Sequence, residues 1–179
     1  MTDSLNELPR IIPPSPWVAV HCGRTAPGGC ILDLACGSGR HARFLAGLGF
    51  AVVAVDRDAE AIATLQDVPG ISAMQLDLEG EVWPLAGRSF AGIVVTNYLW
   101  RPRLPDVLAM LAPGGVLIYE TFMVGNEAWG KPSSPAFLLR PGELREVVQA
   151  AGLCEIAFAE GYTASPKPAV RQAICAVRA

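Results

Sequence analysis

The sequence carries little charge and has no long apolar run. Charged residues make up 17% of its 179 positions and hydrophobic residues 51%, which excludes a disordered or fibrous chain. No stretch of about 18 or more apolar residues is free of charges and of Gly or Pro, so a membrane span is not expected. The net charge of −3 gives no general attraction to nucleic acid or anionic lipid. The length suits one domain with a real core.

Cysteine pairs and a secretion signal are also missing. The five cysteines are odd in number, include no C-x-x-C pair, and in three cases lie in apolar, strand-like runs where Cys acts as a small hydrophobe. The N-terminal MTDSLNELPR carries acids and lacks the basic start and apolar run of a signal peptide. We therefore expect a reduced, cytoplasmic protein.

The segment 30–56, CILDLACGSGRHARFLAGLGFAVVAVD, organises the rest of the chain. An apolar run at 31–34 predicts a buried strand, and the glycines at 37 and 39 predict a turn. Helical spacing of apolar residues over 40–48 predicts a helix, and a β-branched run over 51–55 predicts a strand that ends on Asp56. Strand, glycine turn, helix, strand and acid form half of a nucleotide-binding α/β unit.

Strands and helices continue to alternate along the chain. Further strands are predicted at 71–76, 90–96, 116–122, 154–159 and 172–177, and further helices at 17–22, 58–65, 104–111 and 142–151. Ser15-Pro16 is a helix-start signal for the first of these helices, and Pro113-Gly114-Gly115 is expected to stop the helix at 104–111. This order predicts an α/β fold, a doubly wound, mostly parallel seven-stranded sheet with helices on both faces. The last two strands have no helix between them, so they must pair antiparallel or one must insert between its neighbours. We expect an N-terminal arm and short helix at 1–27 and the domain at 28–179.

Two ligand classes compete for the glycine turn. The pattern Gly37-x-Gly39-x-x-Ala42, followed by Asp56, fits a nicotinamide dehydrogenase. Asp33, which precedes these glycines at the end of a buried strand, favours another ligand, because a buried carboxylate is costly unless something compensates it. A pyrophosphate would not compensate it, whereas the cationic ammonium group of S-adenosylmethionine would.

Three features resemble the class I S-adenosylmethionine-dependent methyltransferases. They are the motif DLACGSG at 33–39, the motif LAPGGVLI at 111–118, and the paired last strands. The chain is also too short for the separate substrate domain of a dehydrogenase. The segment 119–144, YETFMVGNEAWGKPSSPAFLLRPGEL, is similar to small bacterial enzymes of the tellurite-resistance and thiopurine-methyltransferase type.

The resemblance implies S-adenosyl-L-methionine as the cofactor and a site at the carboxyl ends of the strands. The implied cofactor-binding residues are Asp33, Ala35, Gly37, Gly39, Asp56, Asp77, Leu78 and Asn97. Asp56 would accept hydrogen bonds from the ribose, and Asp77 would reach the adenine amino group with Leu78 against the ring. The alternative role for such acids is a helix N-cap, which we prefer for Asp58.

No catalytic set stands out, and methyl transfer needs none when the cofactor already activates the electrophile. Tyr98 and Glu120 are the expected catalytic residues, although Glu120 would alternatively be paired internally. His41 would touch the cofactor's carboxylate or face solvent. Arg101 would bind an anionic substrate or pair with a surface acid. The loop 123–139 would form a lid or a solvated connector.

No motif in the sequence identifies the molecule that accepts the methyl group. After the fourth strand the sequence NYLW at 97–100 lacks the two prolines of DNA amino-methylases, and no cysteine follows a proline as in cytosine C5 enzymes. We therefore expect a methyltransferase for a small-molecule acceptor, with no metal and no clear nucleic-acid signal. The alternatives are an RNA or protein methyltransferase that needs a partner for recognition, and a catalytically idle S-adenosylmethionine-binding regulatory protein.

Overall fold

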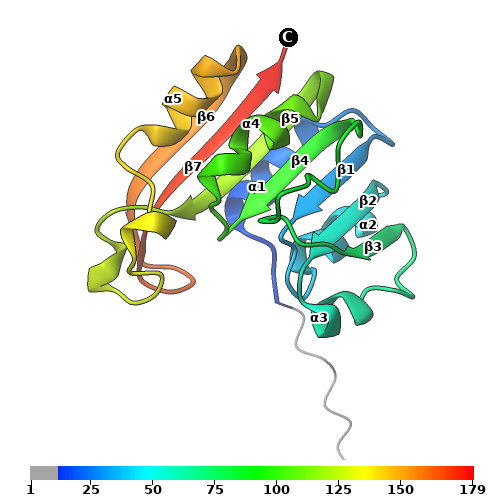
Figure 1. Cartoon of the computed structure of the whole chain (residues 1–179), viewed down its shortest axis with the longest axis horizontal. Helices are drawn as coiled ribbons and strands as arrows, with labels where there is room; N and C mark the ends of the chain where they lie inside the picture. Colours follow the sequence, from blue (N-terminus) through cyan, green and yellow to red (C-terminus); the bar gives the residue numbers. More distant parts are fainter. Residues whose placement is uncertain (1–11) are drawn as a thin grey trace, which may run out of the picture.

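A seven-stranded sheet of order β3-β2-β1-β4-β5-β7-β6 forms the centre of the computed structural model, which describes residues 12–179 (Figure 1). The strands are β1 (Cys30–Leu34), β2 (Ala51–Asp56), β3 (Ile71–Gln75), β4 (Phe90–Thr96), β5 (Leu111–Phe122), β6 (Leu153–Thr163) and β7 (Ala169–Arg178). Strands β1 to β5 are parallel, and β7 lies antiparallel between β5 and β6. The last strand therefore inserts between its neighbours and also pairs antiparallel. The predicted fold class is confirmed.

Helices cover both faces of the sheet. They are α1 (Pro16–His21), α2 (Arg40–Gly47), α3 (Ala59–Ala63), α4 (Leu104–Ala109) and α5 (Glu143–Ala150), with 3-10 turns η1 (Cys22–Arg24), η2 (Arg101–Arg103), η3 (Asn126–Ala128) and η4 (Pro135–Phe137). One apolar core contains residues of α4 and α5, and a second contains residues of α1, α2 and α3. Side chains alternate along β1, so that Leu32 and Leu34 enter the first core and Ile31 enters the second.

Two predicted helix starts are confirmed in atomic detail. The Ser15 hydroxyl accepts a 3.1 Å hydrogen bond from the Trp17 amide, and Pro16 occupies the first turn of α1. One Asp58 carboxylate oxygen accepts from the amides of Glu60 and Ala61, at 2.9 and 3.2 Å, and caps α3. The predicted arm over residues 1–11 lies outside the described residues, and the domain boundary at residue 27 stays a prediction.

The fifth strand and the last two strands are longer than predicted. Strand β5 begins at Leu111, which pairs with Phe90, and then shifts register before Val116 pairs with Gly92. The expected helix stop at 113–115 is thus a tight turn within β5, where a Cβ on Gly115 would lie 2.7 Å from the Ala112 carbonyl oxygen. No helix among residues 12–179 has the length and apolar character needed to cross a bilayer.

Candidate active site

The carboxyl ends of β1, β2, β3 and β4 surround a cavity of about 240 Å³. Its lining residues are Ala35, Asp56, Arg57, Leu76, Asp77, Leu78, Glu79, Asn97 and Tyr98. Six of these were predicted as site residues from the sequence, and the fold brings them together from four separate strand ends. This edge is where open α/β sheets place their ligands.

The backbone around the cavity is held in left-handed conformations. Gly37 and Gly39 have φ values of 53° and 76°, and Ala35 has a φ of 54° although it is not a glycine. A Cβ on Gly39 would come within 2.5 Å of the Leu65 side chain, so this position also needs glycine for close packing. The turn therefore begins at Ala35, which follows β1 directly and lines the cavity.

Asp33 lies behind this turn as a buried carboxylate. It is 1% exposed, and neither of its oxygens has a hydrogen-bond partner among residues 12–179. Burial raises the pKa of Asp33 to about 7, and the nearby Ala42 amide and Arg40 charge offset this only in part. The compensating group expected from the sequence is thus not supplied by the protein. An unpaired buried carboxylate beside a glycine turn fits a cationic ligand group such as an ammonium.

The acids that end β2 and follow β3 are already partly engaged. The Asp56 carboxylate accepts from the amides of Gly37 and Asp58, at 2.8 and 3.0 Å, and remains partly exposed. Asp77 is exposed and accepts a 3.0 Å hydrogen bond from the Glu79 amide. Each carboxylate has further lone pairs for a ligand. Leu78 is 5% exposed and joins the apolar core beneath the cavity.

Asn97 and Tyr98 close one end of the cavity. Asn97 is left-handed, with a φ of 56°, and its amide donates to the Glu120 carbonyl at 3.0 Å. The buried Tyr119 hydroxyl donates to the Tyr98 carbonyl at 2.8 Å, which fixes this loop. The Tyr98 hydroxyl is buried and has no partner among residues 12–179. Burial, with the charges of Glu79 and Asp77, raises the pKa of Tyr98, so its hydroxyl stays protonated.

Glu120, predicted as a catalytic residue or an internally paired one, is paired. Its carboxylate accepts from the Ser15 hydroxyl at 2.6 Å and from Arg171 at 3.2 Å. Both contacts are partly buried, so the carboxylate is not a free base in this structure. Its place at the carboxyl end of β5, opposite Thr96 of β4, is nevertheless the predicted one.

His41 does not face solvent, which corrects one of its two predicted roles. The residue is 1% exposed, and its Nε2 accepts from the Ser15 amide at 3.1 Å. The ring proton must then be on Nδ1, which is 3.3 Å from the Thr96 hydroxyl. Burial, with the nearby Arg40 charge, lowers the pKa of His41 to about 4. His41 thus joins α1 to β4 as a neutral ring.

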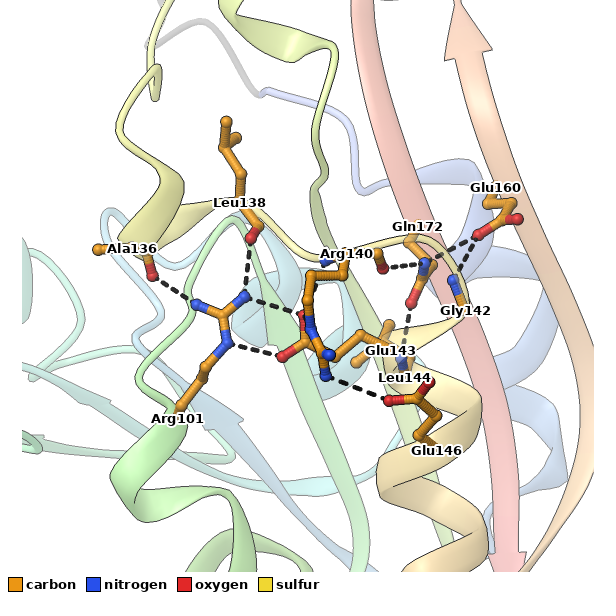
Figure 2. Close-up of polar contacts among 10 residues, drawn as sticks. All are labelled: Arg101, Ala136, Leu138, Arg140, Gly142, Glu143, Leu144, Glu146, Glu160 and Gln172. Atoms are coloured by element: carbon orange, nitrogen blue, oxygen red, sulfur yellow. Dashed lines mark hydrogen bonds and ion pairs between the residues drawn. The ribbon is translucent and has the colours of Figure 1, made fainter.

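Arg101 is not available to an anionic substrate, because it forms the centre of a polar cluster (Figure 2). Its guanidinium donates to both Glu143 oxygens at 2.6 and 2.9 Å, and to the carbonyls of Ala136 and Leu138 at 2.8 and 2.7 Å. Burial opposes ionisation of Glu143, but hydrogen bonds from Arg101 and the Arg140 amide outweigh it and lower the pKa of Glu143. The predicted partner acid exists, but its side chain is only 5% exposed rather than on the surface.

The loop 123–139 is tied to the domain at several points. The Asn126 side chain donates to the Pro132 carbonyl at 3.0 Å and accepts from the Val170 amide at 3.1 Å. The Trp129 ring packs at a tilt of 43° against Tyr162 of β6, with ring centroids 4.8 Å apart. Arg101 holds the far end of the loop, as described above. Through these contacts, the loop packs against β6 and β7.

The lining residues Arg57, Leu76 and Glu79 were not among the predicted site residues, and neither was Arg171, which contacts Asn97 of the lining. It projects from β7 and donates to Asn97 and Glu120. The available signal was an arginine within the apolar run AVRQAICAV at 169–177, where a charged side chain needs a buried partner. Among residues 12–179, no group of three or more His, Cys, Asp or Glu could hold a metal ion.

Comparisons with known proteins agree with this geometry. Residues 31–115 match a protein family described as "Methyltransferase domain". TehB from Haemophilus influenzae has 20% identity and a TM-score of 0.73 over 89% of this chain, which spans 61% of TehB. A TehB-like SAM-dependent methyltransferase from Corynebacterium glutamicum has 22% identity and a TM-score of 0.67, over 91% of this chain and 87% of that protein.

A third solved structure contains a cofactor product. Magnesium protoporphyrin IX methyltransferase from Synechocystis, with bound SAH, has 17% identity and a TM-score of 0.67, over 91% of this chain and 78% of that protein. No curated protein sequence matches the chain significantly. The solved structures show the fold, and the family match covers its glycine turn and cofactor edge. Residues 31–115 therefore match a methyltransferase-domain family, and the chain has the fold of TehB-like SAM-dependent methyltransferases.

Proposed function

We propose that the chain transfers a methyl group from S-adenosylmethionine to a small-molecule acceptor. The observation that carries the proposal is the unpaired, buried carboxylate of Asp33 in β1, two residues before Ala35 of the cavity lining. Without a bound cation, the unpaired carboxylate would cost about 3 kcal/mol or more of folding free energy. The family match over residues 31–115 supports the same cofactor.

Different residues near the cavity would bind different parts of the cofactor. Asp33 would accept hydrogen bonds from its ammonium group, Asp56 from the ribose hydroxyls and Asp77 from the adenine amino group. Ala35, Gly37 and Gly39 would let main-chain atoms approach closely, and Leu78 would lie against the adenine. When bound, the cofactor supplies a methyl carbon on a positively charged sulfur, which is already a strong electrophile.

The chain's own residues would promote the reaction mainly by positioning the methyl donor and the acceptor, and less by transferring protons. Glu120 is held by Ser15 and Arg171, and His41 has both ring nitrogens engaged in the interior. Tyr98, with its raised pKa, stays protonated at neutral pH, so its hydroxyl can donate a hydrogen bond but does not act as a base. Holding donor and acceptor in line and excluding water are then the main catalytic effects. Tyr98 and Asn97 are the residues that we place beside the acceptor.

A labelling experiment tests this function. Purified protein is incubated with methyl-labelled S-adenosylmethionine and a panel of thiols, carboxylic acids, oxyanions and amines, and then with RNA and cell lysate. We expect label on at least one small molecule, as the name of the protoporphyrin methyltransferase relative implies for that enzyme. Label found only on RNA or protein would favour the partner-dependent alternative. Cofactor binding without any labelled product would favour an idle regulatory protein.

A further inference from the structure

The segment 77–82 follows β3 and carries Asp77 and Leu78 of the cavity lining, yet it has few bonds to the rest of the protein. In the part of the chain that the structure describes, no main-chain to main-chain hydrogen bond involves this segment. The buried Leu78 side chain fixes one point of it. The Glu79 carboxylate lies 4.0 Å from the guanidinium of Arg57, which is 77% exposed, so this ion pair adds little. The course of the main chain beyond Leu78 therefore depends on another side chain.

Arg103, the last residue of η2, supplies the missing bonds. Its Nη2 donates to the Gly80 carbonyl at 2.6 Å and to the Glu81 carbonyl at 2.5 Å. Among the described residues, these are the only hydrogen bonds that join the segment 77–82 to another part of the chain. Both have a charged donor, which makes them stronger than bonds between neutral groups.

The Arg103 guanidinium is itself held in place. Its Nη1 donates to an Asp106 oxygen of α4 at 3.1 Å, and the group lies over the Trp83 ring, 5.9 Å from the centroid. The Arg103 side chain is 21% exposed, so water screens these contacts only in part. Arg103 therefore fixes the segment 77–82 relative to η2 and α4.

The main chain that Arg103 holds lies against the Asp77 carboxylate. A Cβ placed on Gly80 would be 3.5 Å from Oδ2 of Asp77, so the Gly80 main chain borders this oxygen. The other oxygen, Oδ1, accepts a 3.0 Å hydrogen bond from the Glu79 amide. The contacts that orient the Asp77 carboxylate thus belong to the segment that Arg103 secures.

The orientation of Asp77 decides which purine it can recognise. An ionised carboxylate only accepts hydrogen bonds, so it pairs with the amino group of adenine. Hypoxanthine has an oxygen in place of that amino group, and the N–H on this edge moves to the ring. A carboxylate held in one position loses its bond to hypoxanthine and faces an oxygen, whereas a mobile carboxylate turns to the ring N–H or to solvent.

We propose that Arg103 is a positioning residue that makes the site select an amino-bearing purine over an oxo-bearing purine. By bonding two carbonyls of the segment 77–82, it holds the Asp77 carboxylate toward the nucleoside. Arg103 is not among the residues that line the cavity, so it acts through this segment. The inference rests on the proposed function, because it concerns the cofactor of that reaction.

Equilibrium binding of two matched nucleosides tests this role. S-adenosylhomocysteine and S-inosylhomocysteine differ only at the amino or oxo edge of the purine, and each is titrated by calorimetry into wild type and R103Q. We expect wild type to bind the adenosyl compound about tenfold or more tightly, as the loss of one charge-assisted hydrogen bond implies. In R103Q, which loses the charged donors, the preference should fall to about threefold or less.

Replacement of Asp77 locates the effect. D77N removes the charged acceptor and should itself lower the preference to about threefold or less. Adding R103Q to D77N should then leave the preference unchanged, because both substitutions act on the same contact. A residue with a purely structural role would weaken the binding of both nucleosides and leave the ratio of their affinities intact.

Two further variants control for folding and for loss of an arginine. R103M keeps the length of the side chain without its donors and should lose the preference as R103Q does, so either variant serves if the other does not fold. R88Q removes an exposed arginine from the end of the same loop, which donates to Met74 Sδ and not to the segment 77–82. R88Q should keep the wild-type preference. Thermal melts establish that each variant is folded at the titration temperature.

Three results would overturn the inference. They are equal affinities of wild type for the two nucleosides, a preference that R103Q and R103M leave intact, and a further fall when R103Q is added to D77N. Failure of the proposed function has a different signature, binding of S-adenosylhomocysteine without any labelled product, and it would leave the role of Arg103 standing. Absence of binding of both nucleosides to wild type would contradict the two proposals together.

Discussion

The backbone amide of Gly37 donates a 2.8 Å hydrogen bond to the Asp56 carboxylate, so the glycine turn after β1 is bound directly to the acid that ends β2. The second Asp56 oxygen accepts from the Asp58 amide. One carboxylate thus holds the two main-chain segments that face the cavity and still has lone pairs for a ligand. The acid that the resemblance assigns to the ribose also shapes the turn that would receive the cofactor's methionine part.

Replacement of Asp56 should weaken cofactor binding. D56A removes a charged hydrogen-bond acceptor and leaves the Gly37 amide without its partner. We expect the binding free energy of S-adenosylhomocysteine to become about 2–3 kcal/mol less favourable. D58A is the control, because it removes only the cap of α3 and should cost about 1 kcal/mol of stability without changing the affinity. Calorimetry measures both. Equal affinities in D56A and wild type would show that the ribose site is misplaced.

Asp33 should make the folded protein less stable at neutral pH than an uncharged variant. Burial raises the pKa of Asp33 to about 7 from an ordinary value of 3.8, so between these values the folded chain keeps a proton that the unfolded chain has lost. This contribution to stability therefore falls as the pH rises from about 4 to 7. We expect the free energy of unfolding of D33N to exceed that of wild type by about 2–4 kcal/mol at pH 7.5 and by little at pH 4. Urea denaturation at several pH values measures the difference, and a constant difference would contradict the assignment.

His41 should have the opposite pH dependence over much of the same range. Burial lowers the pKa of His41 to about 4 from 6.5, so the unfolded chain takes up a proton that the folded chain refuses. This contribution is complete above pH 6.5 and is lost as the pH falls toward 4. H41Q keeps an acceptor for the Ser15 amide without a titrating ring. Relative to wild type, H41Q should gain stability as the pH falls from 6.5 to 4, and a loss over that range would refute the buried neutral ring.

Arg101 should matter for stability and not for the cofactor. R101A leaves Glu143, 5% exposed, without its bidentate partner and releases the Ala136 and Leu138 carbonyls, for an expected cost of about 2–4 kcal/mol. R140A removes a second arginine from the same acid, but that side chain is 68% exposed and should cost less than about 1 kcal/mol. Urea denaturation compares the two. Similar costs, or a weakened affinity for S-adenosylhomocysteine in R101A, would mean that Arg101 serves the site instead.

Most of the fold was predictable, because its signals are local. Apolar runs and helical spacing located every long strand and helix, and Ser15 and Asp58 marked two helix starts. The turn within β5 was not predictable, since Pro113-Gly114-Gly115 after a helix favours a stop and only the pairing of Phe90 with Leu111 extends the strand. The end of β6 was missed because Gly161 is partly exposed, Tyr162 is exposed, and the segment shows no apolar alternation.

The site was predictable where it depends on strand ends and not where it depends on distant pairs. Asp33 and Asp56 lie at or next to the last residues of β1 and β2, and Asp77 and Asn97 come just after β3 and β4, so parallel pairing alone brings them to one edge. The contacts of Arg101 with Glu143 and of Arg171 with Asn97 join residues far apart in sequence, and no local pattern specifies such pairs. For the same reason His41 was expected beside the cofactor or in solvent, whereas α1 covers it.

Calorimetric titration of the purified protein with S-adenosylhomocysteine, and in parallel with NAD, tests the central claim most directly. The unpaired Asp33 carboxylate and the acids of the cavity predict saturable binding of S-adenosylhomocysteine that D33N and D56A weaken, and no binding of NAD. Tight binding of NAD without binding of S-adenosylhomocysteine would contradict the account.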